Sequence, residues 1–193
     1  MKKIVLASNN QHKVKEFKKM LKDYEILTME DIGYTEEIEE TGTTFAENAF
    51  IKAETIHNYL KEKGLEYIVV ADDSGLCCEV LNGAPGVYSA RYAGSHGNNE
   101  ANRAKLRKEL FGKNRTAYFV CNILVYYPNG EHKLFEGRTY GKIIDEERGK
   151  TDFGYDCIFL SDELNKTFGE ATEEEKNSVS HRGRAIKEML KDF

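Results

Sequence analysis

The sequence predicts an α/β fold, with a mixed sheet that carries helices on its faces. Three observations lead to this prediction. The chain opens with a short apolar strand, a polar turn and an amphipathic helix. Residues 67–71 (YIVVA) are the best candidate for a buried strand. Two strand-like runs flank Pro128-Asn129-Gly130, a turn sequence that predicts a β-hairpin.

The first half of the chain alternates strands with helices. We expect strands at residues 3–8 and 24–28, with a helix between them. The apolar face of this helix consists of Val14, Phe17, Met20 and Leu21. A second helix should begin after Thr44, because Thr44 and Glu47 have the spacing of a capping box. Its apolar stripe consists of Phe45, Ala49, Ala53, Ile56 and Leu60.

The middle of the chain contains the hairpin. A turn-rich segment at residues 82–86 precedes a helix that we expect at residues 99–111. The hairpin strands are expected at residues 116–127 and 131–140, and a short strand at residues 157–160.

The C-terminal segment predicts two helices. Thr172 and Glu175 have the spacing of a capping box for the first, and Ser180 is an N-cap residue for the second. No internal repeat or low-complexity linker interrupts the chain, so we expect residues 1–193 to form a single domain.

The composition limits the classes of function. A net charge of −5 argues against a sequence-independent nucleic-acid binder, which would carry a basic excess. No apolar run approaches the roughly 20 residues that span a bilayer, so we expect no membrane partner. The cysteines show no metal-binding spacing and predict reduced thiols in a cytoplasmic protein. They are Cys77, Cys78, Cys121 and Cys157.

Two carboxylates and a hydroxyl follow the YIVVA strand directly, in Asp72-Asp73-Ser74-Gly75. We interpret this segment as an acidic turn that closes the strand, where ligands of open α/β sheets collect. Hard oxygen ligands of this kind suit Mg²⁺, together with phosphate oxygens. The alternative is an ordinary Asp/Ser turn with helix-capping duties. Glu40, in the run Glu39-Glu40-Thr41-Gly42, is a further candidate carboxylate, although such runs are often solvated edges.

A possible anion site lies at the first strand-to-helix junction. Residues 8–13 (SNNQHK) would offer backbone N–H groups at a helix N-terminus, and Lys13 would add a positive charge one turn in. The alternative is that Ser8 and the asparagines are ordinary N-cap residues.

Two later segments could contact a nucleobase. Phe153-Gly154-Tyr155-Asp156 could stack on a base, or its aromatic residues could anchor the core. Ser180-His181-Arg182, with Lys176 nearby, offers donors at a helix start. Basic residues there oppose the helix dipole, which favours a functional role.

Some catalytic classes are excluded by missing motifs. Gly149-Lys150-Thr151 resembles the end of a P-loop, but Ile144 stands where its first glycine should be. There is no G-x-G-x-x-G motif and no G-x-S-x-G elbow, and nothing spaces a nucleophile with a base.

Taken together, five blocks of the chain resemble the pyrophosphatases of inosine and xanthosine triphosphates, which remove non-standard purine nucleotides from the pool. The blocks follow one another in order along nearly the whole chain. They are Ser8-x-Asn10-x-x-Lys13, Glu40-Thr41-Gly42-x-x-Phe45-x-Glu47-Asn48-Ala49, residues 71–92 (ADDSGL to SARY), Phe153-Gly154-Tyr155-Asp156, and Glu174-Glu175-Lys176-Asn177-x-x-Ser180-His181-Arg182.

The resemblance implies an elongated fold of two lobes around a central active-site cleft, a homodimer, and Mg²⁺-dependent hydrolysis between the α and β phosphates. It implies that Asp73 is the general base and, with Glu40, a metal ligand. The residues implied for triphosphate binding are Ser8, Asn9, Asn10, Gln11, His12, Lys13 and Ser74, with Lys52 as a further candidate. Those implied for base binding are Phe153, Gly154, Tyr155, Asp156, Lys176, His181 and Arg182.

Two other functions stay open at the level of the sequence. One is a related pyrophosphatase that acts on modified pyrimidine nucleotides. The other is a nucleotide-binding regulatory module without hydrolytic activity, which the intact carboxylates at positions 40, 72 and 73 argue against.

Overall fold

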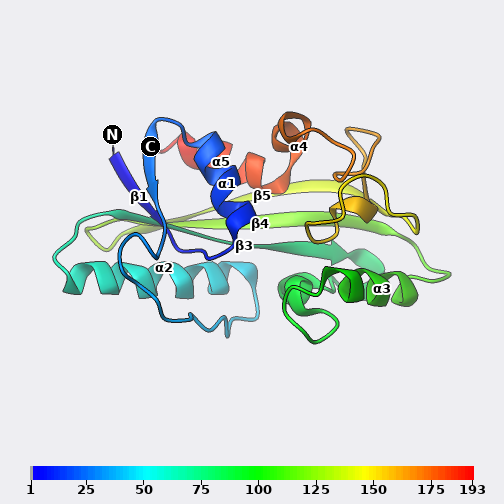
Figure 1. Cartoon of the computed structure of the whole chain (residues 1–193), viewed down its shortest axis with the longest axis horizontal. Helices are drawn as coiled ribbons and strands as arrows, with labels where there is room; N and C mark the ends of the chain where they lie inside the picture. Colours follow the sequence, from blue (N-terminus) through cyan, green and yellow to red (C-terminus); the bar gives the residue numbers. More distant parts are fainter. Residues whose placement is uncertain (1) are drawn as a thin grey trace. The chain divides into compact units, whose positions relative to one another are not determined.

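The computed structural model describes residues 2–193 and contains a six-stranded mixed sheet in the order β2-β1-β3-β4-β5-β6 (Figure 1). β1 pairs in parallel with β2 and β3, whereas β5 and β6 are antiparallel. The predicted mixed α/β fold is therefore confirmed. The strands are β1 (Lys2–Leu6), β2 (Tyr24–Leu27), β3 (Ile68–Cys78), β4 (Thr116–Tyr126), β5 (His132–Ile143) and β6 (Phe159–Ser161).

The helices begin at the capping residues that the sequence predicts. Thr44 and Thr172 each form a complete capping box, with Glu47 and Glu175 respectively. The Ser180 hydroxyl accepts the N–H of Gly183 at 3.0 Å. The α-helices are α1 (Gln11–Met20), α2 (Phe45–Glu62), α3 (Asn99–Glu109), α4 (Glu173–Val179) and α5 (His181–Leu190), and three short 3₁₀ turns are η1 (Glu79–Leu81), η2 (Gly86–Arg91) and η3 (Asp156–Ile158).

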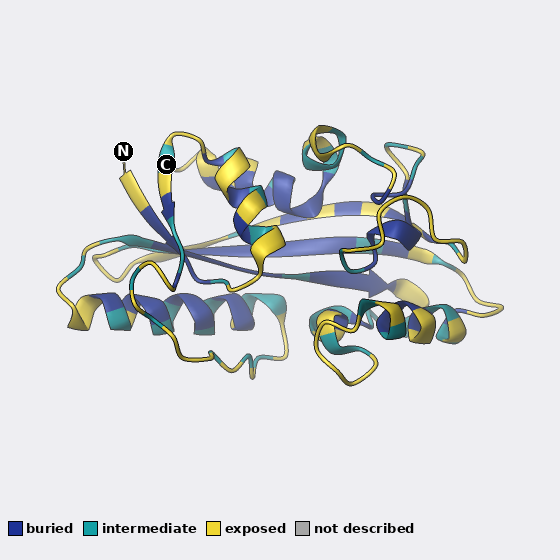
Figure 2. Cartoon of the chain, viewed as in Figure 1, coloured by how far each residue is buried: buried dark blue, intermediate teal, exposed yellow. Residues whose placement is uncertain are grey.

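The chain divides into two compact units. The first unit comprises residues 1–73, 122–135 and 189–193, and the second comprises residues 74–121 and 136–188. Buried residues line the strands of both (Figure 2). No helix in the part of the chain that the structure describes is long and apolar enough to cross a membrane.

In the first unit, α1 and α2 pack against opposite faces of β1 and β3. The odd-numbered residues of β1 and β3, such as Val5 and Val69, pack against the apolar stripe of α2. Figure 1 shows α1 on the opposite face of these two strands. The α1 residues Val14 and Phe17 are buried. Alternate side chains of β1 and β3 therefore point to α1 and to α2.

The acidic segment is not a turn, and this part of the prediction is wrong. β3 continues through Asp72-Asp73-Ser74 and ends only at Cys78. The strand continues because Leu76 and Cys78 beyond the polar segment are fully buried. What ends here is the neighbouring strand: the last β1–β3 pair joins Leu6 to Val70. The carboxylates therefore follow the carboxyl end of β1, within the middle of β3.

A second boundary also differs from the prediction. The expected strand at residues 157–160 begins instead at Phe159, because Asp156–Ile158 forms the turn η3. The hairpin is confirmed: β4 and β5 are neighbours in the sheet, and Tyr127 N–H donates to the Glu131 carbonyl at 2.8 Å.

Candidate functional site

A cluster of carboxylates and lysines lies in the first unit, where β1 ends beside β3. We call it the carboxylate–lysine cluster, and it consists of Lys13 from α1, Glu40 from the preceding loop, Asn48 and Lys52 from α2, and Asp72 and Asp73 from β3. Five of these residues belong to the set that the sequence singled out, and only Asn48 received no role there.

Asp72 and Asp73 point to opposite faces of the sheet, because successive side chains of a strand alternate. The Asp72 carboxylate is fully buried and pairs with the Lys13 ammonium of α1 at 3.2 Å. The Asp73 carboxylate faces α2 and accepts the amide of Asn48 at 3.1 Å. Asp72 is therefore held from α1 and Asp73 from α2, while the Lys13 and Lys52 ammonium groups also act electrostatically on Asp73.

Lys52 connects three parts of the cluster. Its buried ammonium lies 2.5 Å from Glu40 Oε1 and donates to the backbone carbonyl of Asp72 at 2.6 Å. Burial alone would lower the pKa of Lys52, but Asp73, Asp72 and Glu40 together raise it above its ordinary value. Lys52 is therefore a permanent positive charge within the cluster.

Asp73 is a carboxyl with a strongly perturbed pKa. Burial in the cluster raises the pKa of Asp73 to about 6, against the opposing effect of the Lys52 and Lys13 ammonium groups. The Glu40 carboxylate adds to the rise, and the hydrogen bond from Asn48 opposes it. Such a group exchanges protons close to neutral pH, as a general base must.

Asn48 also fixes the loop that carries Glu40. Its side-chain oxygen accepts the Gly42 N–H at 2.8 Å while its amide donates to Asp73. A Cβ at Gly42 would lie 2.6 Å from that oxygen, so only glycine permits this approach. One buried side chain thus holds the Glu40 loop against Asp73.

At the start of α1, where the sequence predicts an anion site, two of the backbone N–H groups already donate to a side chain of the protein. The Asn10 side chain accepts the backbone N–H groups of His12 and Lys13, at 3.0 and 3.2 Å. The Ser8 hydroxyl accepts the N–H of Asn10 at 3.2 Å. In this conformation the Lys13 ammonium, rather than these capped N–H groups, is the group that can meet an anion.

A second set of polar and aromatic residues lies in the second unit. We call it the aromatic–basic set, and it consists of Ser74, Phe153, Asp156, Lys176, His181 and Arg182. Lys176 of α4 pairs with Asp156 at 2.7 Å and lies over the Phe153 ring, 4.7 Å from its centroid. The His181 ring stacks on Phe119 at 4.8 Å.

Arg182 and Tyr155 are held by the protein interior. Arg182 is 2% exposed and donates to the Ser74 hydroxyl at 2.9 Å. Tyr155 is buried in the second core and donates its hydroxyl proton to the Ser89 carbonyl at 2.6 Å. The ring of Tyr155 is thus a core anchor, whereas the Phe153 side chain is half-buried.

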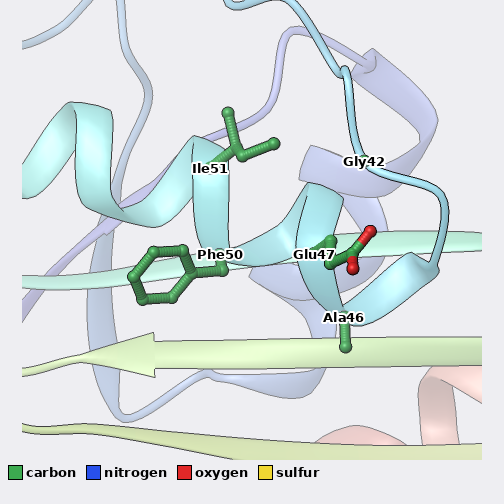
Figure 3. A pocket seen from close by; sticks show the side chains of 5 residues that line it. All are labelled: Gly42, Ala46, Glu47, Phe50 and Ile51. Atoms are coloured by element: carbon green, nitrogen blue, oxygen red, sulfur yellow. The ribbon is translucent and has the colours of Figure 1, made fainter.

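An open groove of about 400 Å³ lies at the start of α2, and none of the cluster residues lines it (Figure 3). Ala46, Phe50 and Ile51 make it apolar. The Glu47 carboxylate on its rim accepts the Thr43 N–H at 2.6 Å, so it serves the helix cap. The groove offers nothing that would hold a phosphate.

Comparison with known proteins gives the chain a family. The sequence profile described as the Ham1 family matches residues 4–192. The chain belongs to the Ham1 family. A Clostridium perfringens protein named dITP/XTP pyrophosphatase is 52% identical, over 100% of this chain and 97% of its own. A Bacillus subtilis protein of the same name is 46% identical, over 99% and 96%. The solved structure of the Staphylococcus aureus Ham1 protein covers 99% of this chain and 97% of its own, at 43% identity and a TM-score of 0.87.

The family predicted from the five sequence blocks is therefore confirmed. The blocks gave no role to Asn48. Asn48 and Lys52 lie one helical turn apart on α2, beside the apolar stripe of Ala49 and Ala53. A polar residue next to a buried stripe, one turn before the candidate Lys52, is a signal that could have marked Asn48 as a site residue.

The residues present fit a magnesium ion that enters with a triphosphate. Within residues 2–193 no three His, Cys, Asp or Glu side chains form a ready metal cluster. However, the chemistry of the donors is suitable, because Mg²⁺ is usually held by one or two carboxylates plus substrate phosphates. Glu40 and Asp73 supply two carboxylates that interact electrostatically, and a cation beside the buried Asp73 would favour its ionised form.

Proposed function

We propose that this Ham1 protein hydrolyses the non-standard purine triphosphates ITP, dITP and XTP to the monophosphate and pyrophosphate. The observation that carries the proposal is the carboxylate–lysine cluster, with a carboxyl of pKa about 6 beside two lysines. The names of the Clostridium and Bacillus relatives support the substrate class.

The triphosphate binds at the lysines of the cluster. A triphosphate brings three to four negative charges to a protein of net charge −5, so local positive charge is required. Lys13 and Lys52 provide it, with Ser8 to Gln11 and Ser74 as hydroxyl, amide and backbone contacts. Lys13 is partly exposed and keeps its contact with the buried Asp72 while its ammonium also meets a phosphate oxygen.

Asp73 accepts the proton of the attacking water. The reaction breaks the bond between the α-phosphorus and the bridging oxygen, and the pyrophosphate leaves with the electron pair. Asn48 holds the Asp73 carboxylate in position. Glu40 and Asp73 would hold a magnesium ion, which would supply charge neutralisation of the phosphates.

The base binds at the aromatic–basic set. Phe153 stacks on the purine, with Gly154 and Asp156 lining the same loop, and His181, Arg182 and Lys176 offer donors toward a 6-oxo group. Adenine presents an amino donor at that position, so buried donors would face a donor and lose their hydrogen bonds. Mismatches of this kind discriminate strongly between substrates.

The test is a panel of nucleotides. We expect pyrophosphate release, detected separately from single phosphate release, from ITP, dITP and XTP with Mg²⁺ and far less from ATP. Faster release from dTTP or UTP would support the pyrimidine enzyme instead. No release in a single turnover with stoichiometric protein would support the regulatory module.

We also propose that the protein is a cytoplasmic homodimer. The family resemblance supports the dimer, and the unbridged thiols at positions 77, 78, 121 and 157 support a reducing compartment. Light scattering of the purified protein tests the dimer, because a monomer mass at micromolar concentration would contradict it.

A further inference from the structure

The loop that carries Phe153 is held by a buried arginine that the site described so far does not include. Arg103 lies on α3, and its side chain is 5% exposed. Its Nη1 donates to the Gly154 carbonyl at 2.8 Å and, more weakly, to the Thr151 carbonyl at 3.4 Å. Its Nε donates to Glu147 Oε1 at 3.0 Å. One guanidinium therefore ties both ends of residues 151–154 to a helix.

The neighbouring residue on α3 holds a second loop in the same way. Asn102 accepts the Ala93 N–H at 2.7 Å and donates to the Ala90 carbonyl at 3.1 Å. The Tyr155 hydroxyl meets this loop at the Ser89 carbonyl. Consecutive residues of α3 thus fix two segments, and Tyr155 joins those segments to each other.

We propose that Arg103 is a positioning residue that sets substrate affinity and base selectivity by holding residues 151–154, and with them Phe153. This inference rests on the proposed function, in which Phe153 contacts the base. Arg103 lies beneath the loop and is not itself a catalytic residue. The planar guanidinium of Arg103 can donate to a carboxylate and to a carbonyl at the same time. The single ammonium of a lysine cannot reproduce both contacts in this geometry.

Arg107 provides a matched control. It lies one turn further along α3, and its Nη1 also pairs with Glu147 Oε1, at 3.2 Å. Its other contact is the Asp145 carbonyl at 3.1 Å, outside residues 151–154. Arg103→Lys and Arg107→Lys therefore make the same chemical change on the same helix, next to the same glutamate. Arg107 is the more exposed of the two, at 25% against 5%, and only the change at Arg103 removes contacts with residues 151–154.

The first measurement uses no nucleotide. Loss of a charge-assisted hydrogen bond should speed amide hydrogen exchange of residues 151–156 in Arg103→Lys by about tenfold, with no such change in Arg107→Lys. Equal exchange in the two variants would overturn the anchoring role. Glu147→Gln, which keeps the contact between Arg103 and Gly154, serves as a second variant and should give a smaller increase.

The second measurement uses steady-state kinetics with dITP and dGTP. We expect Arg103→Lys to raise KM for dITP about tenfold and to change kcat by less than about twofold, because base binding is made before the chemical step. The ratio of kcat/KM for the two nucleotides should also fall, and Arg107→Lys should match the wild type. A fall in kcat alone, or a parallel loss in both variants, would overturn the selectivity role. An inactive wild-type protein would instead refute the proposed function and leave the exchange result standing.

Discussion

Two adjacent aspartates show how strand geometry separates roles at the scale of single residues. Asp72 points toward α1 and is fully buried against Lys13. Asp73 points toward α2 and is held by Asn48. The sequence marks both as candidate metal ligands, but only the alternation of side chains along β3 distinguishes them. Asp73 retains slight exposure, 7% against 0% for Asp72, and burial raises its pKa.

The pH dependence of the metal-free protein should report this shift. The pKa of Asp73 is raised from 3.8 to about 6, so the folded state binds more protons than the unfolded state between these values. Asp73 therefore makes folding less favourable as pH rises from about 4 to about 6. Carbon-13 spectra of the aspartate carboxyls should show one group that titrates near 6, and Mg²⁺ with a nucleotide should lower that value. Titration of every aspartate near 4 would contradict the assignment.

At the scale of elements, the sequence predicts those helices and turns whose ends are set by residues close together in the chain. The capping boxes and the Pro128-Asn129-Gly130 hairpin depend on neighbouring residues. The end of β3 depends on distant ones, because the burial of Leu76 and Cys78 carries the strand through the acidic segment. The role of Asn48 was missed for the same reason: its partners, Gly42 and Asp73, come together only in the fold.

The position of α5 depends on a close approach to β5. A Cβ at Gly137 would collide with the His181 carbonyl and lie 2.5 Å from the Ala185 nitrogen. Gly137→Ala should therefore push away the first turn of α5, which carries His181 and Arg182, and destabilise the protein by roughly 1–3 kcal/mol.

Urea unfolding measures the loss in the free energy of unfolding of Gly137→Ala. The KM for dITP should also rise, because the displaced turn carries His181 and Arg182. Lys133→Ala on the same strand is the control, since its side chain is exposed and its ion pair with Asp192 lies on the surface. A Gly137→Ala protein with wild-type stability and KM would show that α5 does not depend on this approach.

At the scale of the whole molecule, binding can be separated from hydrolysis. Asp73→Asn keeps an acceptor for Asn48 and removes the charge whose burial is unfavourable, so the variant should be at least as stable as the wild type at neutral pH. An inactive, folded variant would retain its substrate intact. A ligand at 100 times its Kd stabilises the folded state by about 2.7 kcal/mol.

The midpoint temperature of thermal unfolding of Asp73→Asn should therefore rise by several degrees when dITP and Mg²⁺ are added together. We expect a smaller rise with dATP, because the donors of the aromatic–basic set do not match adenine. Equal shifts for the two nucleotides would place the selectivity elsewhere in the protein.

The most direct test of the account is pyrophosphate release from dITP, with Mg²⁺ at neutral pH, by the wild type and by Asp73→Asn. Removal of a general base costs about a hundredfold or more in rate, so we predict rapid release by the wild type and a loss of at least that size in a variant that remains folded. Near-wild-type release by Asp73→Asn would contradict the role of Asp73 in hydrolysis.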